Sequence, residues 1–144
     1  MKTRNWTIPL LGLFLAAPLV ALTGCGERAI AVVPVSGKVL FQGQPTPGAQ
    51  VVLHPVAKDP KRVFSATGKV QDDGTFKVGV NVDGDGAPPG EYVATVQWFK
   101  VVQSEGGSGP GPNVIPAAYS DPGQSPLKVT VKDGPTELEP FQLR

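Results

Sequence analysis

Short apolar runs separated by clusters of glycine and proline are the feature that most limits the folds open to this chain. From Cys25 to the last of the 144 residues, glycine and proline make up 30 of the 120 residues. At that content a disordered chain is a serious alternative. The glycines and prolines gather, however, between runs rich in valine, phenylalanine and leucine, as turns alternate with strands. The pattern therefore predicts an ordered all-β domain, because its apolar residues can offset the entropy lost on ordering.

Within these runs apolar and polar residues alternate with the period of two that is typical of strands. The runs that predict strands are residues 33–41, 49–56, 63–71, 76–80, 91–105, 127–131 and 138–143. The Asp73-Gly74 pair predicts a tight hairpin turn, because glycine supplies the positive φ that such turns require. Residues 106–112 are expected to form a flexible loop. About seven strands and no helix after the first hydrophobic segment predict an antiparallel β-sandwich, with a small barrel as the alternative.

Residues 1–24 have the order of a secretory signal peptide, for which we expect an N-terminal signal helix. A basic start is followed by an uncharged apolar run at about residues 8–22 and then by small residues. The run has about 15 residues, whereas a membrane-spanning helix needs roughly 20. Pro9 and Pro18 weaken the alternative of an uncleaved transmembrane helix further.

The apolar run ends in Leu22-Thr23-Gly24-Cys25, which holds the only cysteine of the chain. This segment resembles the lipobox of bacterial lipoproteins, in which an aliphatic residue and two small residues precede a cysteine. The resemblance implies cleavage before Cys25 and a diacylglyceryl group on its thiol. Residues 25–32 would then form a lipidated tether and residues 33–144 the folded domain. An ordinary signal peptide with a chance cysteine is the alternative.

The charge balance and the single thiol exclude several classes of protein. From Cys25 onward the chain has 11 lysines and arginines against 12 acidic residues, without a basic stripe. Nucleic-acid binding and electrostatic docking to acidic lipid are therefore poorly supported. One cysteine cannot form an intrachain disulfide. The residue after Cys25 is Gly26 rather than aspartate, so the usual sorting rule favours the outer over the inner membrane.

Four segments, in order, resemble a carboxypeptidase regulatory-like domain. They are Val-Ser-Gly-Lys-Val at 35–39, Gly-Gln-Pro-Thr-Pro-Gly-Ala at 43–49, Asp-Asp-Gly-Thr-Phe at 72–76 and Pro-Gly-Glu-Tyr-Val at 89–93. The resemblance implies a prealbumin-like (transthyretin-like) sandwich and a module that is usually non-catalytic. A transthyretin-like hydrolase of the urate pathway ends in Tyr-Arg-Gly-Ser, whereas this chain ends in Phe-Gln-Leu-Arg. The resemblance therefore does not favour the enzymatic branch.

Two polar features of the sequence are candidates for chemistry. His54 is the only histidine and no nucleophile motif accompanies it, so a triad is not expected and a hydrolase is the weakest hypothesis. Asp83-Gly84-Asp85-Gly86 could hold calcium, but an EF-hand loop counted from Asp83 would place Ala94 where a bidentate glutamate belongs. We predict no catalytic residue, no metal and no cofactor.

The aromatic residues offer the best hint of an interaction surface. Trp98 and Phe99 have opposite parity on the longest run, so one of them should face away from the core. Together with Tyr92 and Tyr119 they could form a platform for a glycan or a peptide. The sequence therefore predicts a non-catalytic envelope lipoprotein with a binding or structural role, its partners a membrane and an envelope protein or glycan; a carbohydrate- or calcium-binding module is the alternative.

Overall fold

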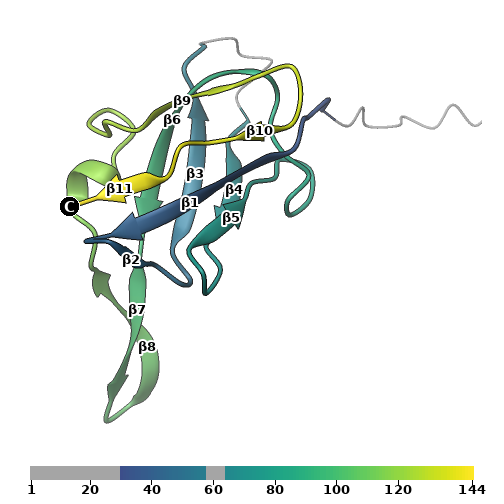
Figure 1. Cartoon of the computed structure of the whole chain (residues 1–144). Coiled ribbons are helices and arrows are strands. Elements are labelled where there is room, and N and C mark those ends of the chain that lie inside the picture. Colours follow the sequence, from purple (N-terminus) through teal and green to yellow (C-terminus); the bar gives the residue numbers. More distant parts are fainter. Residues whose placement is uncertain (1–29, 58–63) are drawn as a thin grey trace, which may run out of the picture.

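The computed structural model describes residues 30–57 and 64–144, and within these ranges it is all-β (Figure 1). The described residues form eleven strands and one short 3-10 helix, η2 (Ala117–Tyr119). The predicted signal peptide, Cys25 and most of the predicted tether lie outside them. Among the described residues no helix is long and apolar enough to cross a bilayer.

The first sheet is built around strand β1 (Val35–Phe41). β1 pairs antiparallel with β2 (Gln44–Pro45) and β5 (Thr75–Lys77). Its pairing with β10 (Thr136–Glu137) and β11 (Phe141–Leu143) is parallel. The expectation of a purely antiparallel fold is therefore wrong for this edge, where the chain returns alongside β1 in the same direction.

The second sheet is antiparallel throughout and has the order β4-β3-β6-β9. Its strands are β4 (Ala66–Lys69), β3 (Gln50–Pro55), β6 (Gly90–Gln97) and β9 (Lys128–Val131). In Figure 1 the first sheet crosses in front of it. Buried side chains from both sheets form a single core, and they include Val35, Val39, Phe76, Val51, Leu53, Ala94, Val96 and Leu143. The fold is thus β-sandwich-like, as the alternating apolar residues require.

A glycine in the middle of β1 makes room for an aromatic ring. Gly37 lies opposite Phe76 in the ladder, and a Cβ on Gly37 would come within 2.7 Å of the Phe76 ring. The Phe76 ring also packs against Phe141 on β11, with ring centroids 5.8 Å apart. The two phenylalanines thereby meet across β1, because the strand between them has no side chain at this position.

The predicted strand at 91–105 is broken at Trp98, and the predicted loop after it is a strand. Beyond β6 the chain continues as β7 (Phe99–Ser104), which pairs with β8 (Gly107–Asn113). Neither β7 nor β8 joins the two sheets of the body. The pair forms a hairpin that projects from the domain near the end of β1 (Figure 1). We refer to residues 98–113 as the hairpin arm.

Candidate functional site

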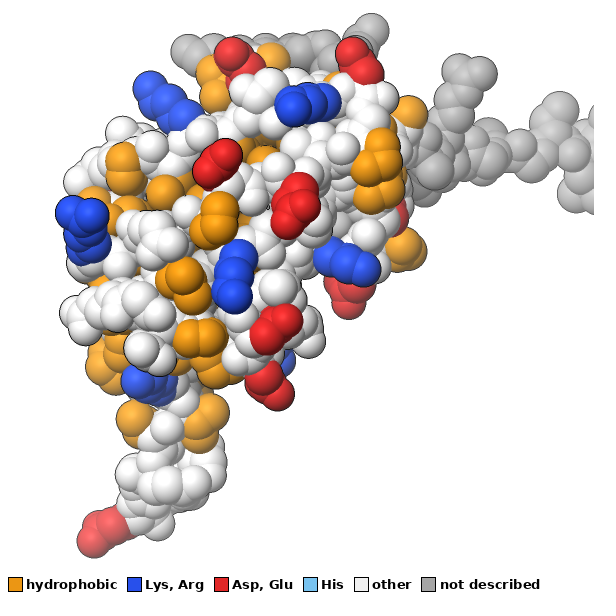
Figure 2. Space-filling model, in the orientation of Figure 1, with side chains coloured by type: hydrophobic (Ala, Val, Ile, Leu, Met, Phe, Trp, Pro, Cys, Tyr) orange, Lys and Arg blue, Asp and Glu red, His pale blue; other side chains and the backbone are white. Residues whose placement is uncertain are grey.

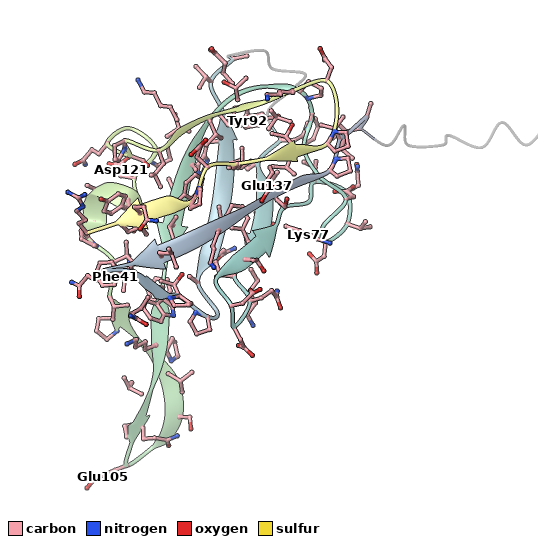
Figure 3. The ribbon with its side chains drawn as sticks, viewed as in Figure 1. Phe41, Lys77, Tyr92, Glu105, Asp121 and Glu137 are labelled. Carbon is pink, nitrogen blue, oxygen red and sulfur yellow. The ribbon has the colours of Figure 1, made fainter. Side chains whose placement is uncertain are left out.

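The hairpin arm carries large apolar side chains that the rest of the domain does not cover. All six residues of β7 are exposed. Phe99 is 49%, Val101 71% and Val102 44% exposed. Figure 2 shows hydrophobic side chains along the arm and an acidic side chain at its tip, which Figure 3 labels as Glu105. A cluster of exposed apolar residues on one projecting element is the kind of surface that binds a partner.

The base of the hairpin arm is fastened to the domain by Asn113. Its side-chain oxygen accepts hydrogen bonds from the backbone N–H of Trp98 at 2.9 Å and of Ile115 at 3.2 Å. Its amide nitrogen donates to the hydroxyl of Ser120 at 2.8 Å, and that hydroxyl lies 3.3 Å from the carbonyl oxygen of Val96. One side chain thereby ties both strands of the arm to β6 and to the segment after the arm.

Trp98 is a part of this base rather than an exposed platform. Its indole N–H donates to the carbonyl oxygen of Pro47 at 2.9 Å, in the turn after β2. The ammonium of Lys100 lies 4.5 Å from the centre of the indole, in the geometry of a cation–π contact. The half-buried Trp98 packs against the core, whereas Phe99 is exposed, which confirms that one of the two faces outward.

The other two aromatic residues do not add to an exposed surface. Tyr92 is buried and its hydroxyl donates to the carbonyl oxygen of Pro88 at 2.7 Å. Tyr119, in η2, is half-buried against the core. Phe99 is therefore the one exposed member of the predicted aromatic set.

His54 lies on β3 and faces β6 on the outer side of the second sheet. Its Nε2 is 3.0 Å from the hydroxyl oxygen of Thr95, which is buried. Burial lowers the pKa of His54 below its usual value, so the neutral ring is favoured near neutral pH. The contact with the Thr95 hydroxyl orients the ring, but it does not supply the carboxylate that orients the histidine of a Ser-His-Asp triad.

The loop predicted as a calcium candidate is organised by the carboxylate of Asp85. This carboxylate accepts hydrogen bonds from the backbone N–H groups of Val80, Asn81 and Val82 at 2.8–3.3 Å, and from the Asn81 side chain at 2.8 Å. Burial raises the pKa of Asp85, but the hydrogen bonds from Asn81, Val80 and Val82 outweigh it and hold the pKa below its usual value. The carboxylate of Asp85 is thus occupied by hydrogen bonds within its own loop. Within residues 30–57 and 64–144 there is no group of three or more His, Cys, Asp or Glu side chains that could hold a metal ion.

A groove of about 530 Å³ lies beside Tyr92, which Figure 3 shows at the end of the domain away from Glu105 and the hairpin arm. Its walls include Ile30, Pro55, Phe64, Pro88 and Tyr92. Apolar residues and prolines dominate this lining, which also includes the acidic residues Glu91 and Asp133. The groove adjoins the two ends of the segment that the structure does not describe between residues 57 and 64.

Comparison of the chain with protein-family models and with curated proteins finds no match. The candidate site therefore rests on geometry alone. Sequence reasoning found Trp98 and Phe99 but missed Lys100 and Asn113, because a lone lysine and a lone asparagine in a Gly- and Pro-rich context show no motif. The signal that was available is the two-residue connection Glu105-Gly106, since an X-Gly pair between two extended segments is typical of hairpins.

Proposed function

We propose that this chain is a membrane-anchored, non-catalytic envelope lipoprotein whose domain acts in binding or in envelope architecture. The observation that carries the proposal is the order of a basic start, an uncharged apolar run, two small residues and the lone Cys25. The thiol would carry a diacylglyceryl group, and the acyl chains, at about 0.8 kcal/mol per buried CH₂, would anchor the chain. The outer membrane is the favoured location.

The folded part fits the proposed role of a prealbumin-like, carboxypeptidase regulatory-like domain. Two sheets pack around one core, and the Gly48, Gly74 and Gly90 turns of the family-like segments adopt positive φ. Glycine at positive φ is common in the turns of many proteins, so no single turn supports the family assignment. The support comes from the order in which the family-like segments follow one another. A domain of this kind supplies a rigid body on which an exposed element can be presented.

The tether would hold the domain close to the membrane with the hairpin arm pointing away from it. Ile30 lies only five residue steps after Cys25, a reach of at most about 18 Å. Ile30 exchanges hydrogen bonds with Asn81 at 3.1–3.2 Å, near the start of β1. The hairpin arm leaves the domain near the other end of β1 (Figure 1). A partner of the arm would therefore approach from the aqueous side.

Membrane fractionation of a bacterium that expresses the full chain tests the proposal. The wild-type protein should pellet with membranes, resist extraction by high salt and carbonate, and dissolve in detergent. Cys25→Ser should release the protein in soluble form or leave it unprocessed. Thr23→Ala keeps a small residue before the cysteine and should fractionate as the wild type does. Unchanged fractionation and processing of Cys25→Ser would contradict lipid anchoring.

A further inference from the structure

The two long edges of the hairpin arm differ in their ability to accept another strand. β8 contains Pro110 and Pro112, which have no backbone N–H, so its outer edge cannot offer a full set of donors. β7 contains no proline, and among the described residues it pairs only with β8. An added strand could therefore extend this small sheet along β7 and not along β8.

The register of the arm identifies the groups that β7 offers. Ser104 pairs with Gly107 at the turn, Val102 with Gly109 and Val101 with Pro110. Antiparallel pairs alternate between hydrogen-bonded and non-hydrogen-bonded, starting from the hydrogen-bonded pair that closes the two-residue turn. Val101 then occupies a non-hydrogen-bonded pair, consistent with a proline opposite it. The N–H and C=O groups of Val101 and Gln103 consequently point outward from the free edge.

The charges of the arm favour a particular occupant. Lys100 lies at the base and Glu105 at the tip, and they are the only charged residues between 98 and 113. A second copy of β7 running antiparallel brings the tip of each arm to the base of the other, so unlike charges approach each other at both ends. A parallel arrangement would place like charges together.

We propose that two copies of this chain associate by antiparallel pairing of their β7 strands. The resulting sheet has the order β8-β7-β7-β8, with a two-fold axis through Val102 of both copies. Val101 of each copy pairs with Gln103 of the other, which uses the outward N–H and C=O groups. Val102 faces its own counterpart in a non-hydrogen-bonded pair, a position in which β-branched side chains stabilise each other. Phe99 of each copy lies beside the tip of the other arm.

The pairing brings Val102 of each copy beside its counterpart and so covers part of the apolar surface that is exposed in a single copy. A strand of six residues buries less surface than the 1,200–2,000 Å² or so of a standard interface. We therefore expect weak association in solution, which strengthens where copies are concentrated on a surface. The pairing itself does not depend on lipidation of Cys25.

Cysteine cross-linking of the full chain tests the pairing and its register. Two Val102→Cys copies would have Cα atoms about 4.5 Å apart, within disulfide range. Two Ser104→Cys copies would be separated by about 14 Å along the strands, beyond that range. The wild type, whose only thiol is Cys25, gives the background of disulfide-linked dimers. Under mild oxidation Val102→Cys should give a dimer band several-fold above that background. Residue 104 lies nearer the tip, so thiols at this position meet in random collisions at least as readily as thiols at position 102. The dimer band of Ser104→Cys should nevertheless stay at the wild-type background.

A backbone variant separates edge pairing from random contact. Val101→Pro removes an outward N–H while leaving the hydrogen bonds between β7 and β8 in place. Combined with Val102→Cys it should reduce the dimer band to background, with an unchanged circular dichroism spectrum. Equal cross-linking of Val102→Cys and Ser104→Cys, no cross-linking of either, or cross-linking of Val102→Cys to a different protein would overturn the proposal.

Discussion

The backbone N–H of Trp98 and the side-chain oxygen of Asn113 form a 2.9 Å hydrogen bond that closes the base of the hairpin arm. A bond from the Val114 N–H to the Trp98 carbonyl oxygen, at 3.0 Å, lies beside it. Because an isolated two-stranded hairpin is marginally stable in water, its attachment to the domain determines whether the arm stays ordered. The contacts of Asn113 therefore hold β7 in the position in which its exposed residues project from the domain.

We expect Asn113→Ala to release the arm. Two backbone N–H groups would lose their acceptor, and loss of such hydrogen bonds costs about 1–3 kcal/mol of unfolding free energy. Amide hydrogen exchange should accelerate at Trp98 and along β7, and urea denaturation should show the loss of stability. Asn113→Asp retains the acceptor and should show a smaller change. Equal exchange rates in Asn113→Ala and the wild type would contradict this role.

Asp85 and Asp83 provide a matched pair in one loop. Asp85→Ala removes the acceptor of four N–H donors and should cost about 1.5–3 kcal/mol, as expected for hydrogen bonds to a charged group. Asp83 is exposed, and Asp83→Ala should change the unfolding free energy by less than about 0.5 kcal/mol. Thermal unfolding of both variants measures the difference. A larger loss for Asp83→Ala than for Asp85→Ala would show that the carboxylate of Asp85 does not organise the loop.

Gly37 is expected to tolerate no side chain. A Cβ at this position would lie 2.7 Å from the Phe76 ring and 3.3 Å from Leu138, so the core must shift. Overpacking of this kind typically costs about 1–3 kcal/mol, and Gly37→Ala should lower the melting temperature accordingly. Gly134 has open space around its Cβ position, so Gly134→Ala is the control and should leave the melting temperature nearly unchanged. Equal melting temperatures for the two variants would refute the close contact.

The domain should become less stable as the pH decreases, and His54 should contribute to this loss. Burial lowers the pKa of His54 in the folded state, so the unfolded chain binds the proton more readily. The contribution is complete above the unfolded pKa of about 6.5 and is lost as the pH falls toward the lower folded pKa. Urea denaturation at a series of pH values from neutral down through the unfolded pKa should show that the free energy of unfolding decreases with decreasing pH. In His54→Gln this decrease should be smaller. An identical decrease in the variant would assign the pH dependence to other groups.

The strands of the body were predictable because their alternation is strong. Val51 and Leu53 are buried while Gln50 is exposed, and Val131 is buried between exposed Thr130 and Lys132. A half-buried strand requires this pattern, and the sequence displays it. The residues of β7 also include aromatic and β-branched side chains (Phe99, Val101 and Val102), which favour a strand even though no core lies beneath them. For this reason the run at 91–105 was predicted as one strand and the break at Trp98 was missed.

Which distant strands pair with each other could not be predicted from the sequence, and the reason is physical. The parallel pairing of β1 with β11 joins Val39 to Phe141, and no local pattern encodes a partner so distant in the chain. The Gly- and Pro-rich composition of 106–112 is typical of a loop, yet Gly111 allows close packing, because a Cβ there would lie 2.7 Å from the Val102 side chain. Of the glycines that indicated flexibility, Gly111 thus fits closely against β7, whereas Gly106, Gly107 and Gly109 have open space around them.

The intact mass of the protein extracted from the membrane of an expressing bacterium tests membrane anchoring most directly. The predicted species begins at Cys25 and carries the added mass of a diacylglyceryl group on the Cys25 sulfur. A species that begins at Met1, or one cleaved elsewhere with an unmodified Cys25 thiol, would contradict the proposed lipoprotein.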